Sequence, residues 1–401
     1  MASLQDVLKV VDWKNEMPHG SHKVLSSIER CHTAAMGYHA YTCDDATCEH
    51  IHIQYHGCRN RHCPHCGSLR AQHWMEDRLR ELLPVKYFHA CPVAKRLGIV
   101  FTLPSELKAI AYLNRKVIYN LLFQSSSHCL LTLSKDEKWL GGVPSISAVL
   151  HSWGQQLDFH PHIHCIVSGG GVDKNLNWKN LKKGKGKYLF PYPVMEPIYK
   201  GFFLEKLHEY IENKTVKLPD NTNWPVLKNK MYNIKWIVYA KNPMGNAAQV
   251  VEYLGRYTQK IAISNHRIKE LDAQGNVNFR YKDYKDGGKR KMLKLSGKEF
   301  LRRFSTHILP PRFVRIRHYG ILGNFKRKER LREILKKFKV PPHPQKLKVP
   351  TNIANLCRFG SSEILCPKCK KGKLVLRHVE LPRSRDGPKN AIEKGVLSDF
   401  K

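Results

Sequence analysis

The chain has 401 residues, 42% of them apolar, which is enough to fill the cores of two or three domains. Lysine and arginine number 69 against 33 acidic residues, and a formal net charge of +36 repels itself unless a polyanion such as nucleic acid is the partner. The first residues lack a signal-peptide core and no stretch reaches the length of a membrane span, which argues against secreted and membrane proteins and predicts a cytoplasmic one.

Residues 1–90 are rich in cysteine and histidine and are expected to form a zinc-binding module. In a reducing compartment, clustered thiols are metal ligands more often than disulfides. The Cys63-Pro-His-Cys66 turn has the shape of a zinc knuckle, which another cysteine pair would complete. The candidates for structural zinc are Cys31, Cys43, Cys48, Cys58, Cys63 and Cys66, with their pairing and the number of ions open. Arg59 and Arg61 lie inside the knuckle and are expected to contact DNA phosphate.

Residues 95–305 have the periodicities of an α+β domain. Strands are expected at 98–104, 145–153, 162–171 and 234–240, and helices at 105–133, 197–212 and 246–260. The order β-α-β-β-α-β, followed by a helix, is that of a ferredoxin-like antiparallel sheet backed by helices. Two or three more strands and a helix follow, and the helix is expected to begin with a capping box from Ser296 to Glu299.

Residues 306–401 form a strongly basic C-terminal region, with a stiff linker expected at 340–350. Phe325 and Phe338 lie among the cations and could stack on bases. Cys366 and Cys369 form with Cys357 a zinc site that is one ligand short unless His378 completes it. The residues expected to bind DNA here are Arg315, Arg317, Lys326, Arg327 and Lys328.

The stretch "LDFHPHIHCIV", residues 157–167, places His162 and His164 on one strand. Side chains alternate across a strand, so the two imidazoles emerge on one face while Ile163 and Cys165 go to the other. A divalent metal ion held by the pair would act as a Lewis acid on a phosphate group.

Tyr253 and Tyr257 lie four residues apart on the helix expected at 246–260, and therefore on one face. The usual explanation for such a pair is an amphipathic core. The alternative is a pair of phenol nucleophiles, which need a nearby cation because the reference pKa of tyrosine is about 10. Arg256 and Lys260 each follow a tyrosine by three positions and would provide that cation.

Four ordered motifs, "HSWGQQLDFHPHIHCIVSGGG", "YLGRYTQKIAISNHR", "FRYKDYKDGGK" and "FVRIRHYGIL", resemble those of a known family. The similarity, from Cys31 to about Gly323, is to the two-tyrosine HUH transposases of rolling-circle insertion sequences, the IS91-like group with a zinc-binding N-terminus. The resemblance implies that His162 and His164 bind Mg²⁺ or Mn²⁺. It also implies that Tyr253 and Tyr257 cleave single-stranded DNA, leaving a 5′-phosphotyrosine and a free 3′-hydroxyl. Related replication initiators carry a Tyr-x-x-Lys motif that Tyr257 and Lys260 match.

The third ligand of the catalytic metal is expected on the strand antiparallel to that of His162 and His164. Gln155 is assigned to the ligand set with His151 as its alternative, while His160 and Asp158 lie close in sequence. Imidazole ligation with open positions suits Mn²⁺ or Mg²⁺ without choosing between them.

We therefore expect a DNA transposase that nicks the single-stranded ends of its mobile element and joins them to target DNA, with zinc in a structural role. A plasmid relaxase or replication initiator with the same chemistry is one alternative. The other is a zinc-dependent DNA-binding regulator without activity. The oligomeric state and the DNA sequences are not predicted.

Overall fold

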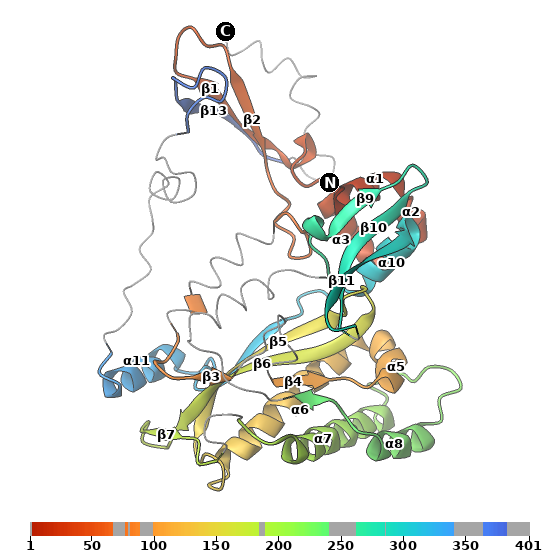
Figure 1. Cartoon of the computed structure of the whole chain (residues 1–401), viewed down its shortest axis with the longest axis vertical. Coiled ribbons are helices and arrows are strands. Elements are labelled where there is room, and N and C mark those ends of the chain that lie inside the picture. Colours follow the sequence, from red (N-terminus) through yellow and green to blue (C-terminus); the bar gives the residue numbers. More distant parts are fainter. Residues whose placement is uncertain are drawn as a thin grey trace.

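The computed structural model describes residues 2–66, 77–78, 81–88, 99–183, 189–239, 262–284, 286–340 and 364–382. It confirms the α+β class, with antiparallel sheets backed by helices (Figure 1). The helix expected at 246–260, most of the linker expected at 340–350, and Cys357 lie outside these residues. Among the helices that the structure describes, none has the length and apolar character of a membrane span.

The central sheet contains the four strands of the expected order. They are β4 (Ile99–Thr102), β5 (Val143–Trp153), β6 (Phe159–Val172) and β8 (Val238–Tyr239). They lie in the order β5-β6-β4-β8, and each hydrogen-bonded pair is antiparallel. Strand β6 separates β4 from β5, and β4 separates β6 from β8. Both β-α-β units are therefore split, as in a ferredoxin-like fold.

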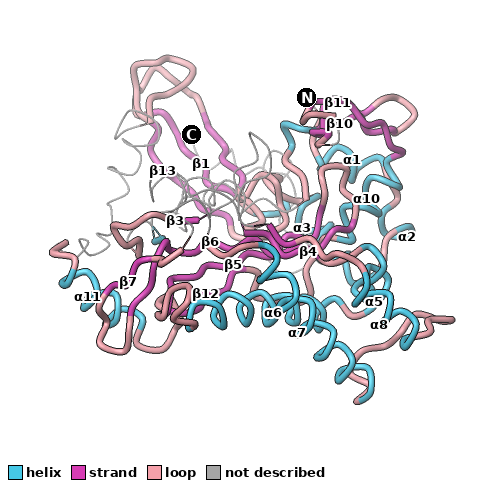
Figure 2. Tube along the Cα trace, turned by 60° about the horizontal axis from the view of Figure 1, so that its bottom comes forward, coloured by secondary structure: helices cyan, strands magenta, loops and turns pink. Residues whose placement is uncertain are grey.

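The connections between these strands are largely helical. After β4 come η2 (Ser105–Leu107), α5 (Lys108–Leu113) and α6 (Arg115–Lys135), and after β6 come α7 (Tyr192–Glu212) and α8 (Trp224–Asn233). Figure 2 shows α6 and α7 side by side along one face of the sheet. Strand alternation sends Ile163, Cys165 and Val167 into the core on this face, so His162 and His164 face the other way.

Three further strands extend the sheet. β3 (Tyr87–Phe88) and β7 (Trp178–Asn180) pair with the second half of β6, and β12 (Ile316–Gly320) pairs with the outer edge of β5. Helix α11 (Arg327–Lys337) follows β12 and packs with Val172 and Leu83 in a small second core. Because β12 supplies backbone hydrogen bonds to β5, the sheet continues past the boundary expected at residue 305.

The N-terminal helices pack against a distant part of the chain. α1 (Leu4–Val10), α2 (Trp13–Glu16) and α3 (His19–Glu29) share a core with η3 (Asn265–Arg267), β9 (Ile268–Leu271), β10 (Asn276–Asp283), β11 (Lys289–Ser296) and α10 (Gly297–Thr306). At the start of α10 the Ser296 hydroxyl accepts the backbone N–H of Glu299 at 3.3 Å, as expected for its cap. The helices of the first 30 residues are therefore buried against residues 265–306.

A third sheet projects from the body of the molecule in Figure 1. It consists of β1 (Tyr38–Cys43), β2 (Ile51–Tyr55) and β13 (Leu374–Glu380), in the order β13-β1-β2, and the 3-10 turn η1 (Ala34–Met36) precedes it. We call this sheet, with the loops of residues 44–50 and 364–373, the arm. Residues close to the two ends of the described chain thus pair as neighbouring strands.

Candidate active site and metal centres

Three histidines meet on the face of the central sheet opposite α6 and α7. His151 of β5 lies directly opposite His162 of β6, and His164 is the next β6 residue on the same face. One nitrogen from each of the three rings lies within 4.8 Å of the others. The centroid of the His151 ring lies 5.5 Å from that of His162 and 4.5 Å from that of His164. The three rings are therefore close enough for one metal ion to bind all of them.

Backbone geometry fixes the tautomer of His162. Its Nδ1 lies 2.6 Å from the carbonyl oxygen of His160 and donates to it, so the lone pair of Nε2 is free for a metal ion. Burial, together with His164 and His160, lowers the pKa of His162 well below its usual value. At neutral pH the ring is thus uncharged, which is the form that binds metal.

Gln155 is placed differently from the expectation. It lies in the loop that joins β5 to β6, where its side-chain oxygen accepts the backbone N–H of Lys282 at 3.4 Å. Arg267 donates to its carbonyl oxygen, and Arg303 donates to that of Gln156 at 3.0 Å. The loop is thereby anchored to β10 and α10, whereas the His151 ring lies beside those of His162 and His164.

His151 is itself held by aromatic packing. Its ring stacks on that of Trp153, with centroids 4.8 Å apart. The guanidinium of Arg315 lies over the Trp153 ring, 5.8 Å from its centroid. Behind Trp153, the Nε2–H of buried His307 donates to the carbonyl of Leu157 at 3.1 Å. Burial lowers the pKa of His307 to about 4, so it stays neutral. Sequence reasoning missed His307, which lies in no motif.

Three arginines expected to bind DNA have partners within the fold. Arg61 donates to the backbone carbonyls of Phe313 at 2.6 Å and Pro310 at 3.4 Å. Arg315 is buried, and burial beside Arg61 lowers its pKa to about 9. Arg317 lies 4.3 Å over the ring of Phe123 and donates to Asn120. They help to hold the zinc-knuckle loop and β12 in place, because their guanidinium groups contact carbonyl oxygens, aromatic rings and an amide within the fold.

The remaining expected contacts are more accessible. Arg59, Lys326 and Lys328 are exposed, whereas Arg327 pairs with Glu81 at 3.1 Å. Phe325 is 78% exposed, so it is available for base stacking. Phe338 is not, because it packs edge-on against Trp178 at 5.4 Å.

The expected nucleophiles, Tyr253 and Tyr257, lie outside the described residues, as do Arg256 and Lys260. The segment that contains them, residues 240–261, directly follows β8. Val100 of β4 pairs with Tyr239 of β8 on one side and with His164 of β6 on the other. Strand β8, which precedes this segment, is therefore separated by β4 alone from β6, the strand that carries His162 and His164.

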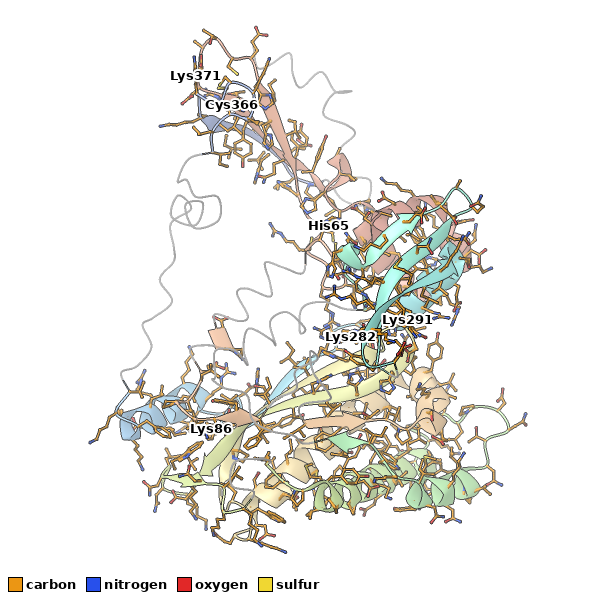
Figure 3. All side chains as sticks on the ribbon, viewed as in Figure 1. His65, Lys86, Lys282, Lys291, Cys366 and Lys371 are labelled. Atoms are coloured by element: carbon orange, nitrogen blue, oxygen red, sulfur yellow. The ribbon has the colours of Figure 1, made fainter. Side chains whose placement is uncertain are left out.

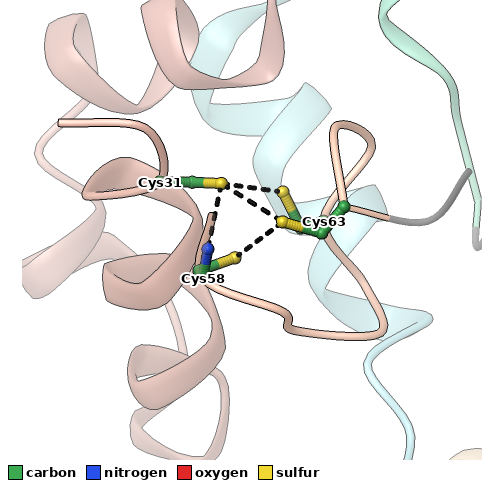
Figure 4. Close-up of side chains that lie close together, drawn as sticks. Cys31, Cys58 and Cys63 are labelled. Carbon is green, nitrogen blue, oxygen red and sulfur yellow. Dashed lines mark hydrogen bonds between the residues drawn. The ribbon is translucent and has the colours of Figure 1, made fainter. Parts of the chain in front are cut away.

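The cysteines form two separate groups. Cys31, Cys58, Cys63 and Cys66 form the first, whose sulfurs all lie within 4.8 Å of one another. Figure 4 shows the side chains of Cys31, Cys58 and Cys63 pointing toward a common centre. The backbone N–H groups of Cys58 and Arg59 donate to Cys31 and Cys66 Sγ, both at 3.3 Å. Four convergent sulfurs with amide donors fit a structural zinc ion.

Cys43 and Cys48 do not join this group. They lie at the tip of the arm beside Cys366 and Cys369, and they take the places that the sequence analysis suggested for Cys357 and His378. The His378 side chain is instead beside Glu380, at 3.4 Å. Pairing between β1 and β13 brings the two cysteine pairs together. The spacing of cysteines along the sequence does not predict this contact.

Loss of the first cluster is expected to unfold the N-terminal region. The loop with Cys63 also carries Arg61 and His62, whose Nε2 accepts the backbone N–H of Leu309 at 3.1 Å. Cys63→Ser should remove one zinc ion per chain and several kcal/mol of stability, because metal binding to such sites is coupled to folding. Metal analysis and thermal unfolding measure both, with Cys129→Ala as a control outside the clusters. Unchanged zinc content in Cys63→Ser would contradict the assignment.

Comparisons with known proteins agree with this arrangement. A family model described as "Putative transposase" matches residues 146–330, and one described as "Transposase zinc-binding domain" matches residues 3–91. Over 364 residues, 88% of each chain, the protein is 37% identical to "Putative transposase y4qJ" of Sinorhizobium fredii. It is 26% identical over 307 residues to "Transposase for insertion sequence element IS801" of Pseudomonas savastanoi pv. phaseolicola, covering 75% of this chain and 70% of that one.

Proposed function

From the premise that this chain belongs to the IS91-family transposases with an N-terminal zinc-binding domain, we propose that it cleaves and transfers single-stranded DNA through a phosphotyrosine. The observation that carries the proposal is the convergence of His151, His162 and His164 on the sheet face opposite α6 and α7. Three convergent imidazoles in a transposase suit a divalent metal ion at the scissile phosphate.

His151, His162 and His164 would hold the ion, Mg²⁺ or Mn²⁺. The hydrogen bond from His162 Nδ1 to the His160 carbonyl leaves Nε2 as the ligand atom of that ring. When bound, the ion supplies Lewis-acid polarisation of a nonbridging phosphate oxygen. The anchored 154–158 loop keeps His151 and His162 in register, since Arg267 and Arg303 hold its carbonyls. The ligands are thus positioned before DNA arrives.

The nucleophile in this proposal is Tyr257 or Tyr253. The phenol oxygen attacks phosphorus, the bond from phosphorus to the 3′ oxygen breaks, and the phenolic proton is passed on as the 3′ oxygen becomes a hydroxyl. Lys260 or Arg256 stabilises the phenolate or the leaving oxygen. In the second half, a 3′-hydroxyl attacks the phosphotyrosine and releases the phenol. The number of phosphodiester bonds is conserved, so no nucleotide cofactor is required.

Two tyrosines allow a second strand cleavage while the first DNA end is still bound to the protein. That capacity fits the movement of a strand from a donor to a target. A nickase that only re-forms its original bond would need one tyrosine.

The basic β10–β11 hairpin is a second support for DNA binding at this place. Figure 3 shows Lys282 and Lys291 of the hairpin beside the ends of β5 and β6. Lys289 and Arg290 at its tip are exposed. Phosphates bound there would lie next to the loop that joins the histidine strands.

The proposal is tested with single-stranded DNA of the element's own ends, labelled at its 3′ end, in Mn²⁺ or Mg²⁺. A 5′-phosphotyrosine keeps the label on the protein in a denaturing gel, and a second strand with a free 3′-hydroxyl then removes it. DNA binding without an adduct in either metal would favour a regulator. An adduct that joins only its own original strand would favour a relaxase or replication initiator.

DNA affinity is expected to fall steeply with salt. A protein making six or more phosphate contacts loses about 10³-fold in affinity between 50 and 200 mM salt, because counterions are released from DNA. Replacing exposed Lys326 and Lys328 with alanine should reduce the slope of log K against log salt, as measured by fluorescence anisotropy. Arg61→Ala is the matched control. It should leave the slope unchanged but lower stability by about 2 kcal/mol, because it removes charged hydrogen bonds to two carbonyls. A flat salt response would contradict the assignment of the basic surface.

A further inference from the structure

Four sulfurs at the tip of the arm come from segments more than 300 residues apart. Cys43 Sγ lies 3.6 Å from Cys369 Sγ, and Cys48 Sγ lies 3.8 Å from Cys366 Sγ. All four lie within 4.8 Å of one another. Sulfurs at the corners of a tetrahedron around zinc, each about 2.3 Å from the ion, are about 3.8 Å apart. We propose that this second cluster binds its own structural zinc ion, which fastens the C-terminal strand β13 to the N-terminal strand β1.

The cluster has the construction of a metal site rather than of a chance group of thiols. A Cβ on Gly372 would lie 2.3 Å from Cys43 Sγ, so only glycine leaves room for the sulfur. The backbone N–H of Gly372 donates to Cys369 Sγ at 3.3 Å. Small residues and amide donors around sulfur are what a thiolate ligand requires, because the donors stabilise its charge.

The first cluster repeats this construction. A Cβ on Gly57 would lie 2.8 Å from Cys66 Sγ, which also accepts a backbone N–H. In each cluster a residue in the left-handed region directly follows a cysteine, Arg59 with φ 52° after Cys58 and Lys370 with φ 59° after Cys369. The same local geometry thus appears at two unrelated places in the chain.

The arm needs such a fastening because it buries little apolar surface. Tyr38 and Ala40 are its buried core, with Ile53 and Tyr55 partly buried against them. On β13, Leu376 is 48% exposed and Val379 is 43% exposed. A three-stranded sheet with so small a core does not hold its edge strand by packing alone, and small modules of this kind rely on a metal ion or a disulfide.

The positive charge around the second cluster also favours a zinc–thiolate site. The segment that carries Cys366 and Cys369 also carries exposed Lys368, Lys370, Lys371 and Lys373. Figure 3 places Cys366 and Lys371 together at the far end of the arm. Four thiolates around one divalent cation carry a net charge of about −2, which offsets the mutual repulsion of the lysines.

The test is zinc stoichiometry of the full chain, by metal analysis and native mass spectrometry, with thiols counted in parallel. Cys366→Ser and Cys369→Ser should each lower the zinc content by one ion per chain relative to the wild type. A double variant that also carries Cys63→Ser should lose two ions per chain. Cys129→Ala, a buried cysteine outside both clusters, should keep the wild-type count. Unchanged zinc in Cys366→Ser, or four cysteines found oxidised in the wild type, would overturn the proposal.

A conservative variant separates zinc binding from a general need for cysteine. Cys369→His preserves a zinc ligand but cannot form a disulfide, so it should retain the ion that Cys369→Ser loses. Hydrogen exchange gives a readout that does not depend on DNA cleavage. Amides of residues 374–380 should exchange faster in Cys369→Ser while those of α6 stay unchanged. Equal protection of β13 in both variants and the wild type would contradict a zinc fastening.

Discussion

Replacing His162 or His164 with alanine is expected to lower the rate of phosphotyrosine formation by about 10³-fold or more. Each supplies one of three nitrogens that converge within 4.8 Å, and removal of a ligand costs several kcal/mol of Lewis-acid stabilisation in the transition state. Single-turnover cleavage of labelled single-stranded DNA measures the rate. DNA affinity in the absence of divalent metal should stay within a few-fold, because neither side chain is needed to bind phosphate without the ion.

The third ligand is identified in the same assay. His151→Ala should resemble His162→Ala, whereas Gln155→Ala should stay within a few-fold of the wild type, since the side-chain oxygen of Gln155 accepts the backbone N–H of Lys282. Mn²⁺ affinity by calorimetry provides the second readout. Should Gln155→Ala lose Mn²⁺ while His151→Ala retains it, the ligand set would be His162, His164 and Gln155.

The double variant Tyr253→Phe, Tyr257→Phe is expected to form no covalent adduct. Phenylalanine keeps the ring and its packing but removes the oxygen that attacks phosphorus. Each single variant should still cleave one strand but lose strand transfer if both tyrosines are needed in turn. Denaturing gels and peptide mapping of the linked residue measure these outcomes.

Tyr281→Phe is the matched control, because Tyr281 lies on β10 close to the active-site loop and has no assigned chemical role. It should cleave at the wild-type rate. An adduct that persists in the double variant would place the nucleophile elsewhere in the chain, and would separate the metal-site proposal from the tyrosine proposal.

Local patterns predicted the central sheet because its strands alternate or are continuously apolar. The placement of His162 and His164 on one face follows directly from that alternation. The sequence could not decide between His151 and Gln155 as the third ligand, because the choice depends on the register between β5 and β6. A shift of one residue exchanges the two faces of a strand. The register places His151 opposite His162, with an irregularity between His151 and Trp153.

The two arginines at the start of β12 and just before it show a different limit of sequence reasoning. Arg315 and Arg317 lie in a basic stretch, which is usually a solvent-exposed or DNA-binding surface. In the folded protein, Trp153 and Phe123 lie beneath their guanidinium groups, and a partner that is distant in sequence cannot be read from local charge. The same holds for the division of the cysteines, since spacing within 31–66 does not reveal that Cys43 and Cys48 pair with Cys366 and Cys369.

The long separation of the arm's two cysteine pairs has a consequence for biosynthesis. Cys48 leaves the ribosome 318 residues before Cys366. At about 5 to 20 residues per second, it therefore waits roughly 15 to 65 s for its partner. We expect the histidine strands to be complete during this interval while the arm is still open. A messenger cut short before codon 366 would thus yield a protein that keeps the histidine strands and lacks β13, the C-terminal strand of the arm.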